Sequence, residues 1–344
     1  MATFWASVFV FAILIFFHEL GHFAVAKAVG IKVHEFSLGF GPKLFGQNRG
    51  GTDYNIRLLP LGGFVRMAGM DPEEEDVEEG KGFNDKTVLQ RMAVITAGPL
   101  MNFFLAAVLM AIIFMLQGMP VQGTTVASVL PGQPAEQAGI KSGDQIYSID
   151  GKKVTNWEEI ITGISNRPGQ PTDVVIIRDN QRIELTVTPV MGEEGRAIIG
   201  ISRVQKLNPL AAFASGVELT FQVTVIILEF VGKMITGQAP ADLGGPVRMV
   251  WEIDRAVDTG FYYLLQLAAF LSINLGLFNL FPIPALDGSR IMFLGLEGLR
   301  GRPVDPAKEN FIHMVGFGLL IMLIVVITYN DILQLFMQGP QGFQ

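Results

Sequence analysis

The residues best suited to chemistry lie in the segment His18-Glu19-Leu20-Gly21-His22, an H-E-x-x-H sequence. On a helix, positions four apart project from one face, so His18 and His22 can bind one metal ion while Glu19 stands beside it. This arrangement is typical of zinc hydrolases, in which the glutamate acts as general base. A chance match on a soluble amphipathic helix, with both histidines satisfied in a core, is the alternative.

The H-E-x-x-H segment lies inside an apolar run. Residues Phe4 to Phe17 carry no charged side chain, and the run continues from Phe23 to Ala26. Apolar residues therefore surround the motif on all faces, which is typical of a membrane-spanning helix. Ionisable side chains inside a membrane cost at least about 2.5 kcal/mol each and usually mark function. A cleavable signal peptide needs a basic start, and no Lys or Arg precedes Lys27, so we expect this helix to stay in the mature protein.

The composition favours a membrane protein. Of the 344 residues, 50% are hydrophobic and 17% are charged, which few soluble domains match. The chain has no cysteine, so any metal must be held by His, Asp or Glu. A formal net charge of −7 argues against a nucleic-acid partner.

Four segments are long and apolar enough to span a bilayer, which requires about 20 residues. We predict them at Phe4 to Val29, Met92 to Gln117, Phe261 to Leu286 and Phe311 to Thr328. A fifth apolar segment, Leu210 to Ile235, carries several charged and polar residues. We interpret it as an amphipathic helix lying on or dipping into the membrane, with a spanning helix as the alternative.

The distribution of Lys and Arg predicts the orientation of the chain. With four spans, the Lys27 to Arg91 loop and the Arg290 to Lys308 loop share one side, and both are rich in Lys and Arg. The positive-inside rule places these loops in the cytoplasm and both termini outside. His18 and His22 then lie within the membrane toward the cytoplasm.

Between the first two spans, residues 35–70 have the pattern of short strands broken by glycine turns. Their apolar side chains are too numerous for an ordinary hydrophilic loop. We predict a β-hairpin that dips into the membrane beside the metal, with an edge free to pair with an extended peptide. A small soluble hairpin that caps the helices is the open alternative. The acidic stretch Asp71 to Glu79 that follows is predicted to be a solvated linker.

Residues 118–205 have the composition of a soluble α+β domain. Within them, Pro131 to Gly151 contains an Ala-Gly-Ile-Lys-Ser-Gly-Asp turn and an Ile-Asp-Gly hairpin, and closely resembles the core of a PDZ domain. PDZ domains bind extended chain ends by adding a strand. Two roles are open here: contact with the end of a substrate, or a steric cap.

Two histidines do not complete a catalytic zinc site, which usually has three protein ligands and one open position. The candidate for the third ligand is Asp287, in Asn279-Leu-Phe-Pro-Ile-Pro-Ala-Leu-Asp-Gly288. Pro282 and Pro284 would break the helix, so the chain around Asp287 is expected to be irregular and able to approach the first helix. A capping aspartate at a helix end is the alternative.

Together these motifs resemble the bacterial site-2 protease family of intramembrane zinc metalloproteases. The shared features are H-E-L-G-H in a first membrane helix, N-L-F-P-I-P-A-L-D-G in a later one, and a single PDZ insertion between them. Ala97-Gly-Pro-Leu-Met-Asn102 and Leu243-Gly-Gly-Pro246 also match the family, but the sequence assigns them no chemistry beyond helix packing and a polar contact. His34 and His313 match no family ligand and are expected to be structural or solvated.

The resemblance implies a set of site residues. It implies that His18, His22 and Asp287 bind Zn²⁺ and that Glu19 is the general base. Residues implied to line the substrate side, with Asn279 contacting an unwound substrate backbone, are Asn274, Asn279, Pro282 and Pro284.

The resemblance also implies the function and the organisation of the chain. The expected activity is hydrolysis of peptide bonds within the transmembrane segments of single-span proteins, in the inner (cytoplasmic) membrane of a bacterium. The expected substrates are a trimmed anti-sigma factor or a leftover signal peptide. The chain would be a polytopic α-helical membrane protein with a first membrane half (1–117), a PDZ domain (118–205), membrane-associated linker helices (206–260) and a second membrane half (261–344).

Two alternatives come from other classes of protein. A metal transporter could place His and Asp inside the membrane, but it would not need Glu19 next to a ligand. A membrane scaffold with a PDZ domain and no catalysis would leave the polar residues at membrane depth unexplained.

Overall fold

The longest elements of the chain are apolar helices. The computed structural model describes residues 1–70, 77–192, 195–240 and 244–338, and five helices in these ranges are long and apolar enough to cross a membrane. The predicted count of four spans is therefore not confirmed, because the helix over the fifth apolar segment meets the same test of length and composition. The five helices are α1 (Ala2–Ala28), α2 (Val88–Gln117), α5 (Pro209–Ile235), α7 (Phe261–Leu280) and α9 (Pro306–Gln338).

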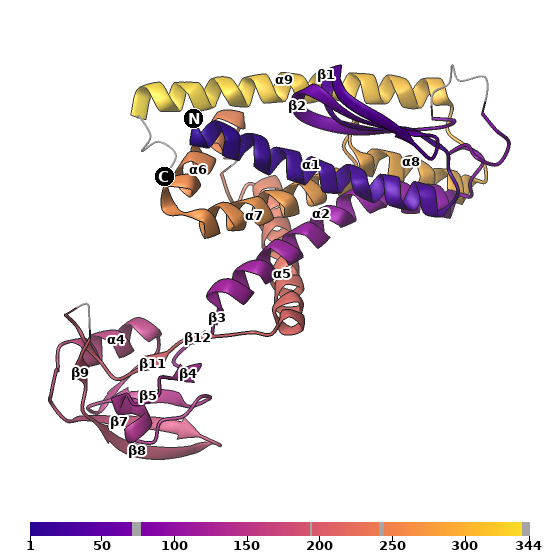
Figure 1. Ribbon diagram of the computed structural model, residues 1–344. Coiled ribbons are helices and arrows are strands. Elements are labelled where there is room, and N and C mark those ends of the chain that lie inside the picture. Colours follow the sequence, from indigo (N-terminus) through magenta and orange to yellow (C-terminus); the bar gives the residue numbers. More distant parts are fainter. Residues whose placement is uncertain (71–76, 193–194, 241–243, 339–344) are drawn as a thin grey trace. The chain divides into compact units, whose positions relative to one another are not determined.

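The chain divides into two compact units (Figure 1). One is formed by Met1–Ala111 together with Phe213–Gln344, and the other by Ile112–Ala212. The first unit holds the H-E-x-x-H segment and Asp287. The second holds the segment that resembles a PDZ domain.

In the first unit, α1 and α2 pass each other with their backbones in contact. A methyl group at Gly21 would lie 2.2 Å from the carbonyl oxygen of Ala97, and one at Gly98 would lie 2.2 Å from Nε2 of His22. α7 packs on the same part of α2, where a methyl group at Gly276 would lie 2.9 Å from the carbonyl oxygen of Pro99. Small residues at these points allow the close approach that membrane helices use in place of a hydrophobic driving force.

The strands β1 (Val33–Arg49) and β2 (Thr52–Met67) form an antiparallel hairpin where one was predicted. The strands are longer than expected and fold back on themselves, so that residues 35–38 pair both with residues 63–66 and with residues 53–56. Gly39 (φ +87°) and Gly41 (φ +82°) lie at the bend of β1, in a conformation that costs glycine least. The hairpin packs on α1 (Figure 1), where the Phe36 ring contacts those of Phe16 and Phe23.

α7 ends at Leu280, six residues before the predicted end of the third span at Leu286. The prediction was too long because Pro282 and Pro284 cannot donate helical hydrogen bonds. The chain turns irregularly until α8 (Asp287–Arg300) begins at the predicted ligand. Before α7 lies the short helix α6 (Pro246–Thr259).

The second unit is an α+β domain. Its four-stranded antiparallel sheet has the order β6-β5-β7-β8, and α4 (Trp157–Ser165) packs on it through the buried Ile160 and Ile164. This arrangement fits the PDZ resemblance. The sheet strands are β5 (Gln145–Ile149), β6 (Lys152–Lys153), β7 (Thr172–Arg178) and β8 (Gln181–Val187). The other elements are β3 (Met119–Pro120), β4 (Ser128–Val129), α3 (Pro134–Gln137), β9 (Val190–Met191), β10 (Ala197–Ile198), β11 (Ile201–Ser202) and β12 (Val204–Gln205).

Candidate active site

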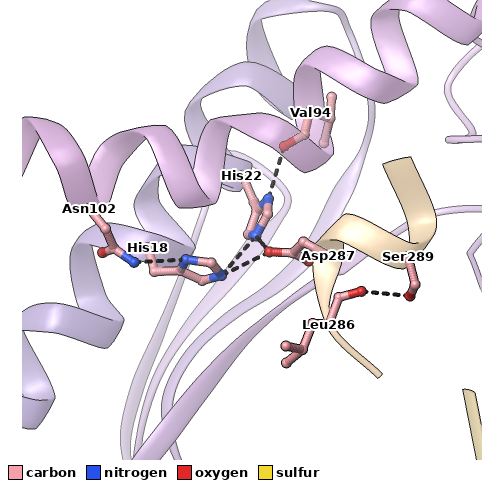
Figure 2. Close-up of polar contacts among 7 residues, drawn as sticks. All are labelled: His18, His22, Val94, Asn102, Leu286, Asp287 and Ser289. Carbon is pink, nitrogen blue, oxygen red and sulfur yellow. Dashed lines mark hydrogen bonds and ion pairs between the residues drawn. The ribbon is translucent and has the colours of Figure 1, made fainter. Parts of the chain in front are cut away.

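Three predicted metal ligands converge at one point (Figure 2). His18 and His22 project from one face of α1, and Asp287 reaches them from the first residue of α8. Oδ2 of Asp287 lies 3.2 Å from Nε2 of His18 and 3.3 Å from Nε2 of His22, and the two Nε2 atoms are 3.2 Å apart. Segments far apart in the sequence thus place three ligand-type atoms within 4.8 Å of one another.

The donor set fits a zinc ion. Two imidazole nitrogens and one carboxylate oxygen give three protein ligands, which leaves one position for water or substrate. Asp287 Oδ2 is buried and has no hydrogen-bond partner in the described part of the chain. Since a buried acceptor without a partner costs free energy, a cation held between the three side chains would satisfy it.

α2 contacts both histidines at their Nδ1 atoms, whereas their Nε2 atoms face Asp287. Nδ1 of His22 donates a hydrogen bond of 2.9 Å to the carbonyl oxygen of Val94, and Nδ1 of His18 lies 3.2 Å from Nδ2 of Asn102 (Figure 2). Gly98 is the residue against which the His22 ring packs, so a side chain there would displace the ring. Gly98 and Asn102 of the Ala97 to Asn102 motif therefore contact the histidine pair, which the sequence of the motif alone did not reveal.

Glu19 lies between the histidines and the hairpin. It follows His18 on α1, and a methyl group at Gly63 of β2 would lie 3.1 Å from Glu19 Cγ and 3.0 Å from the carbonyl oxygen of Ser37. The glycine therefore lets the backbone of β2 approach the carboxylate side chain. Sequence reasoning placed Gly63 in the hairpin but did not predict this contact.

α9 holds the loop that presents Asp287. Ala285 has a positive φ of +76°, and its N–H donates to Nδ1 of His313 over 3.1 Å. A methyl group at Gly316 would lie 2.1 Å from Cβ of Pro284. His313 thus has a structural contact, one of the two roles expected for it.

The predicted substrate-side residues lie on α7 and the loop after it. The Asn274 amide donates to the carbonyl oxygen of Phe270, one turn earlier in α7, over 2.9 Å. Asn279 is half-buried, Pro282 is exposed and Pro284 packs on α9. Their roles toward substrate stay predictions.

The second unassigned motif caps α6. The N–H groups of Gly245 and Arg248 donate to Oδ1 and Oδ2 of Asp331, over 3.4 Å and 3.1 Å, and Asp331 is buried in α9. A carboxylate is stabilising at a helix N-terminus. The motif therefore joins α6 to α9. Leu243, and the larger part of the predicted acidic linker at residues 71–76, lie outside the described residues.

Histidines four apart on a membrane-length helix, a facing aspartate and an adjacent glutamate are the features of an intramembrane metalloprotease. Comparison with known proteins agrees: the model of peptidase family M50 matches residues 6–323. The chain belongs to peptidase family M50.

Three relatives match almost end to end. The zinc metalloprotease RasP of Geobacillus kaustophilus is 37% identical, over 95% of this chain and 97% of the relative. The regulator of sigma-W protease RasP of Bacillus subtilis is 35% identical, over 96% and 98%. A putative zinc metalloprotease of Clostridium perfringens is 40% identical, over 94% and 96%. The predictions of site-2 protease membership, zinc metalloprotease activity and a zinc cofactor are confirmed.

Proposed function

We propose that this chain cleaves peptide bonds within the transmembrane segments of single-span proteins in the bacterial cytoplasmic membrane, with His18, His22 and Asp287 as zinc ligands and Glu19 as general base. The observation that carries the proposal is the approach of Asp287 Oδ2 to within 3.3 Å of the Nε2 atoms of His18 and His22. These two histidines lie on α1, a helix of membrane-spanning length. A transporter site would not need an adjacent glutamate.

The chemistry follows from these groups. Zinc, when bound, polarises the scissile carbonyl and makes water a better nucleophile at neutral pH. Glu19 takes a proton from the attacking water and delivers one to the leaving amine. The two histidines and Asp287 hold the ion in a water-poor site, where electrostatic stabilisation of the developing charge is strongest.

The hairpin provides a means of holding the substrate. The carbonyl groups of a substrate helix are hydrogen-bonded within the helix, so the helix must unwind before cleavage. Residues 63–66 of β2 pair with residues 35–38 on one side and with no other strand in the described part of the chain. This edge starts at Gly63, beside Glu19, so an extended segment added to it would pass the general base. Asn279 is proposed to contact the same unwound backbone.

The surface of the hairpin favours membrane insertion over a soluble cap. Six large apolar side chains on the two strands are from 47% to 68% exposed, and so many on a soluble hairpin would be unusual. These side chains are Phe40, Leu44, Phe45, Ile56, Leu58 and Leu59.

Connections within the first unit support four spans. α5 starts against the later part of α2, where a methyl group at Gly216 would lie 2.4 Å from the carbonyl oxygen of Ala107. α6 contacts the start of α1, where the Thr3 hydroxyl donates to Asp254. Ala107 lies beyond Asn102 on α2, and Thr3 lies at the start of α1, so both contacts are displaced from His22 toward the start of α1. The start of α5 and helix α6 are therefore proposed to lie toward the same side of the membrane. We therefore propose that α5 lies at the membrane surface, with the site toward the cytoplasm and both termini and the PDZ domain outside.

The PDZ domain is proposed to contact substrate ends. A groove of about 620 Å³ runs between α4 and β10 and is lined by Trp157, Ile161 and Ile198, with Arg196 among its polar residues. An apolar groove beside a strand suits an extended chain end with an apolar side chain. Because a relative is named for sigma-W regulation, a membrane-tethered anti-sigma factor trimmed outside the membrane is the proposed substrate class. A leftover signal peptide is the second candidate.

Cleavage of a model single-span substrate by the purified protein in detergent with zinc tests the proposal. We expect Glu19→Gln to lower the rate by a factor of about 10² to 10⁴ while zinc content stays equal to wild type. Cleavage by Glu19→Gln at the wild-type rate would contradict the role of Glu19. If an untrimmed substrate were cut as fast as a trimmed one, the PDZ domain would not control access.

A further inference from the structure

Asn102 is a polar side chain buried in an apolar helix. It has no exposed surface, and the only hydrogen-bonding contact of its side chain in the described part of the chain is that of Nδ2 with Nδ1 of His18, at 3.2 Å. Its Oδ1 is buried without a hydrogen-bond partner among the described residues. Burial of an amide costs free energy unless the amide is paired, so the contact with His18 requires an explanation.

His22 shows what such a contact can do. The carbonyl oxygen of Val94 can only accept, so the proton of the neutral His22 ring is on Nδ1. The lone pair of Nε2 then faces Asp287. A hydrogen bond to one ring nitrogen thus fixes which nitrogen is free to bind metal.

His18 needs the same tautomer. Its Nε2 is the atom that faces Asp287 and the Nε2 of His22, so its proton must lie on Nδ1 when Nε2 binds zinc. The group that faces Nδ1 must then accept a hydrogen bond. Asn102 can do so, because a half-turn of its amide exchanges Oδ1 and Nδ2, two atoms of nearly equal size.

We propose that Asn102 is a positioning residue: its Oδ1 accepts the Nδ1 proton of His18 and so holds this histidine in its zinc-binding tautomer and orientation. The inference rests on the proposed role of His18 as a ligand. It gives the Ala97 to Asn102 motif a defined task, with Val94 just before it serving His22 and Asn102 at its end serving His18.

α7 fixes the backbone from which Asn102 projects. The Ser272 hydroxyl donates to the carbonyl oxygen of Asn102 over 2.8 Å, and a methyl group at Gly276 would lie 3.3 Å from Asn102 Cβ. The amide therefore has little freedom except rotation about its terminal bond. A side chain held in this way can orient a ligand to the accuracy that metal binding needs.

Zinc affinity measured by chelator competition on the purified protein in detergent tests the inference. We expect Asn102→Leu to raise the Kd for zinc by about 10- to 100-fold, the usual effect of losing an outer-shell partner. Asn102→Asp keeps an acceptor oxygen and should stay within about threefold of wild type. The visible spectrum of the Co²⁺-loaded protein should change in Asn102→Leu and be retained in Asn102→Asp. Asn166→Leu, on the exposed surface of the PDZ domain, is the control for an Asn to Leu change elsewhere.

The thermal unfolding of the zinc-free variants separates misfolding from loss of positioning. If Asn102→Leu unfolds early, the smaller Asn102→Ala takes its place. An unchanged zinc Kd in these variants, or an equal loss in Asn102→Asp, would make Asn102 a packing residue and overturn the inference. An unchanged Kd in His18→Ala would instead show that the proposed ligand set is wrong.

Discussion

Gly63 allows the hairpin to approach Glu19, the proposed general base. We expect Gly63→Ala to lower kcat, because the added methyl group would lie 3.1 Å from Glu19 Cγ and 3.0 Å from the Ser37 carbonyl oxygen. The expected loss is about tenfold to a hundredfold, the range for displacing a reacting group by up to about 1 Å. Cleavage kinetics with a model substrate measure it.

The zinc content of Gly63→Ala should equal that of wild type, since the atoms nearest to the added methyl group belong to Ser37, Glu19 and Ile15 and not to the proposed ligands. Gly232→Ala, on α5 with open space around its Cα, is the control for adding a methyl group. An unchanged kcat in Gly63→Ala would show that the close approach of β2 to Glu19 has no catalytic consequence.

At the residue scale, the sequence predicted the groups that converge but not the groups that support them. His18 and His22 are recognisable because helical periodicity alone puts them on one face. Asp287 is recognisable because a charged residue at the end of an apolar segment is costly and usually marks function. The two prolines before it show that the chain is irregular there. The contacts of Asn102 and His313 depend on which helices pack together, and local spacing carries no information about that.

The loop between α7 and α8 aims Asp287, and α9 holds that loop. We expect Gly316→Ala to displace it, because the new methyl group would lie 2.1 Å from Pro284 Cβ. The expected result is a roughly tenfold weaker zinc affinity, as for other losses of outer-shell support. Chelator competition measures it.

Gly318→Ala is the matched control, because this glycine is on the same helix with open space around it. It should bind zinc like wild type. Equal zinc affinity in the two variants would mean that α9 does not position Asp287.

The PDZ domain contains an ion pair between the buried Asp144 and the half-buried Arg178, and this pair has a predictable pH dependence. Arg178 donates from Nε to Oδ1 and from Nη2 to Oδ2 of Asp144, both over 2.7 Å. Burial alone would raise the pKa of Asp144, but the bonds from Arg178 and the Lys141 N–H outweigh it and lower this pKa. The pKa of Asp144 is thus lower in the folded domain than in the unfolded chain, where it is about 3.9. The ion pair therefore stabilises the domain fully at a pH above this unfolded-state pKa, and the stabilisation is lost as the pH falls through the folded-state pKa.

We therefore expect the wild-type domain to lose stability below about pH 4. The Asp144→Asn variant should lack this part of the pH dependence, and it should be less stable than wild type at pH 7. The fluorescence of Trp157 during unfolding, in a Trp5→Phe, Trp251→Phe background, reports on this domain. An identical acid profile in Asp144→Asn would show that the pair does not control acid stability.

At the element scale, the sequence located the long helices well and their ends poorly. Continuous apolar composition identifies α1, α2, α7 and α9, since no other element needs so many apolar residues in a row. Prolines showed that α7 must break, and the structure places its end at Leu280, two residues before Pro282. The hairpin was predicted from glycine turns, whereas its fold-back between residues 35–38 and 53–56 is tertiary pairing.

At the scale of the whole molecule, the path of α5 decides whether the chain crosses the membrane an even or an odd number of times. Composition allows it to cross the membrane, and a fifth crossing with no return before α6 would put the two termini on opposite sides. The contacts of Gly216 with Ala107 and of Thr3 with Asp254 favour a helix that returns to the side from which it started. Composition cannot distinguish these cases, because an interfacial helix and a spanning helix can be equally apolar.

The side of the membrane on which α5 ends can be tested by labelling single introduced cysteines with a membrane-impermeant thiol reagent in intact cells, because the sequence contains no cysteine. With four spans, Gln238→Cys after α5 and Lys152→Cys in the PDZ domain should react, since both positions are exposed and are proposed to lie outside. Glu79→Cys and Arg302→Cys should react only after permeabilisation, because the positive-inside rule places their loops in the cytoplasm. If α5 spans the membrane, Gln238→Cys will behave like Glu79→Cys. Because α6 contacts the start of α1, that result would require Thr236 to Gly245 to cross back before α6. A fully extended chain of this length spans about 33 Å, which only just exceeds the hydrocarbon core of about 30 Å.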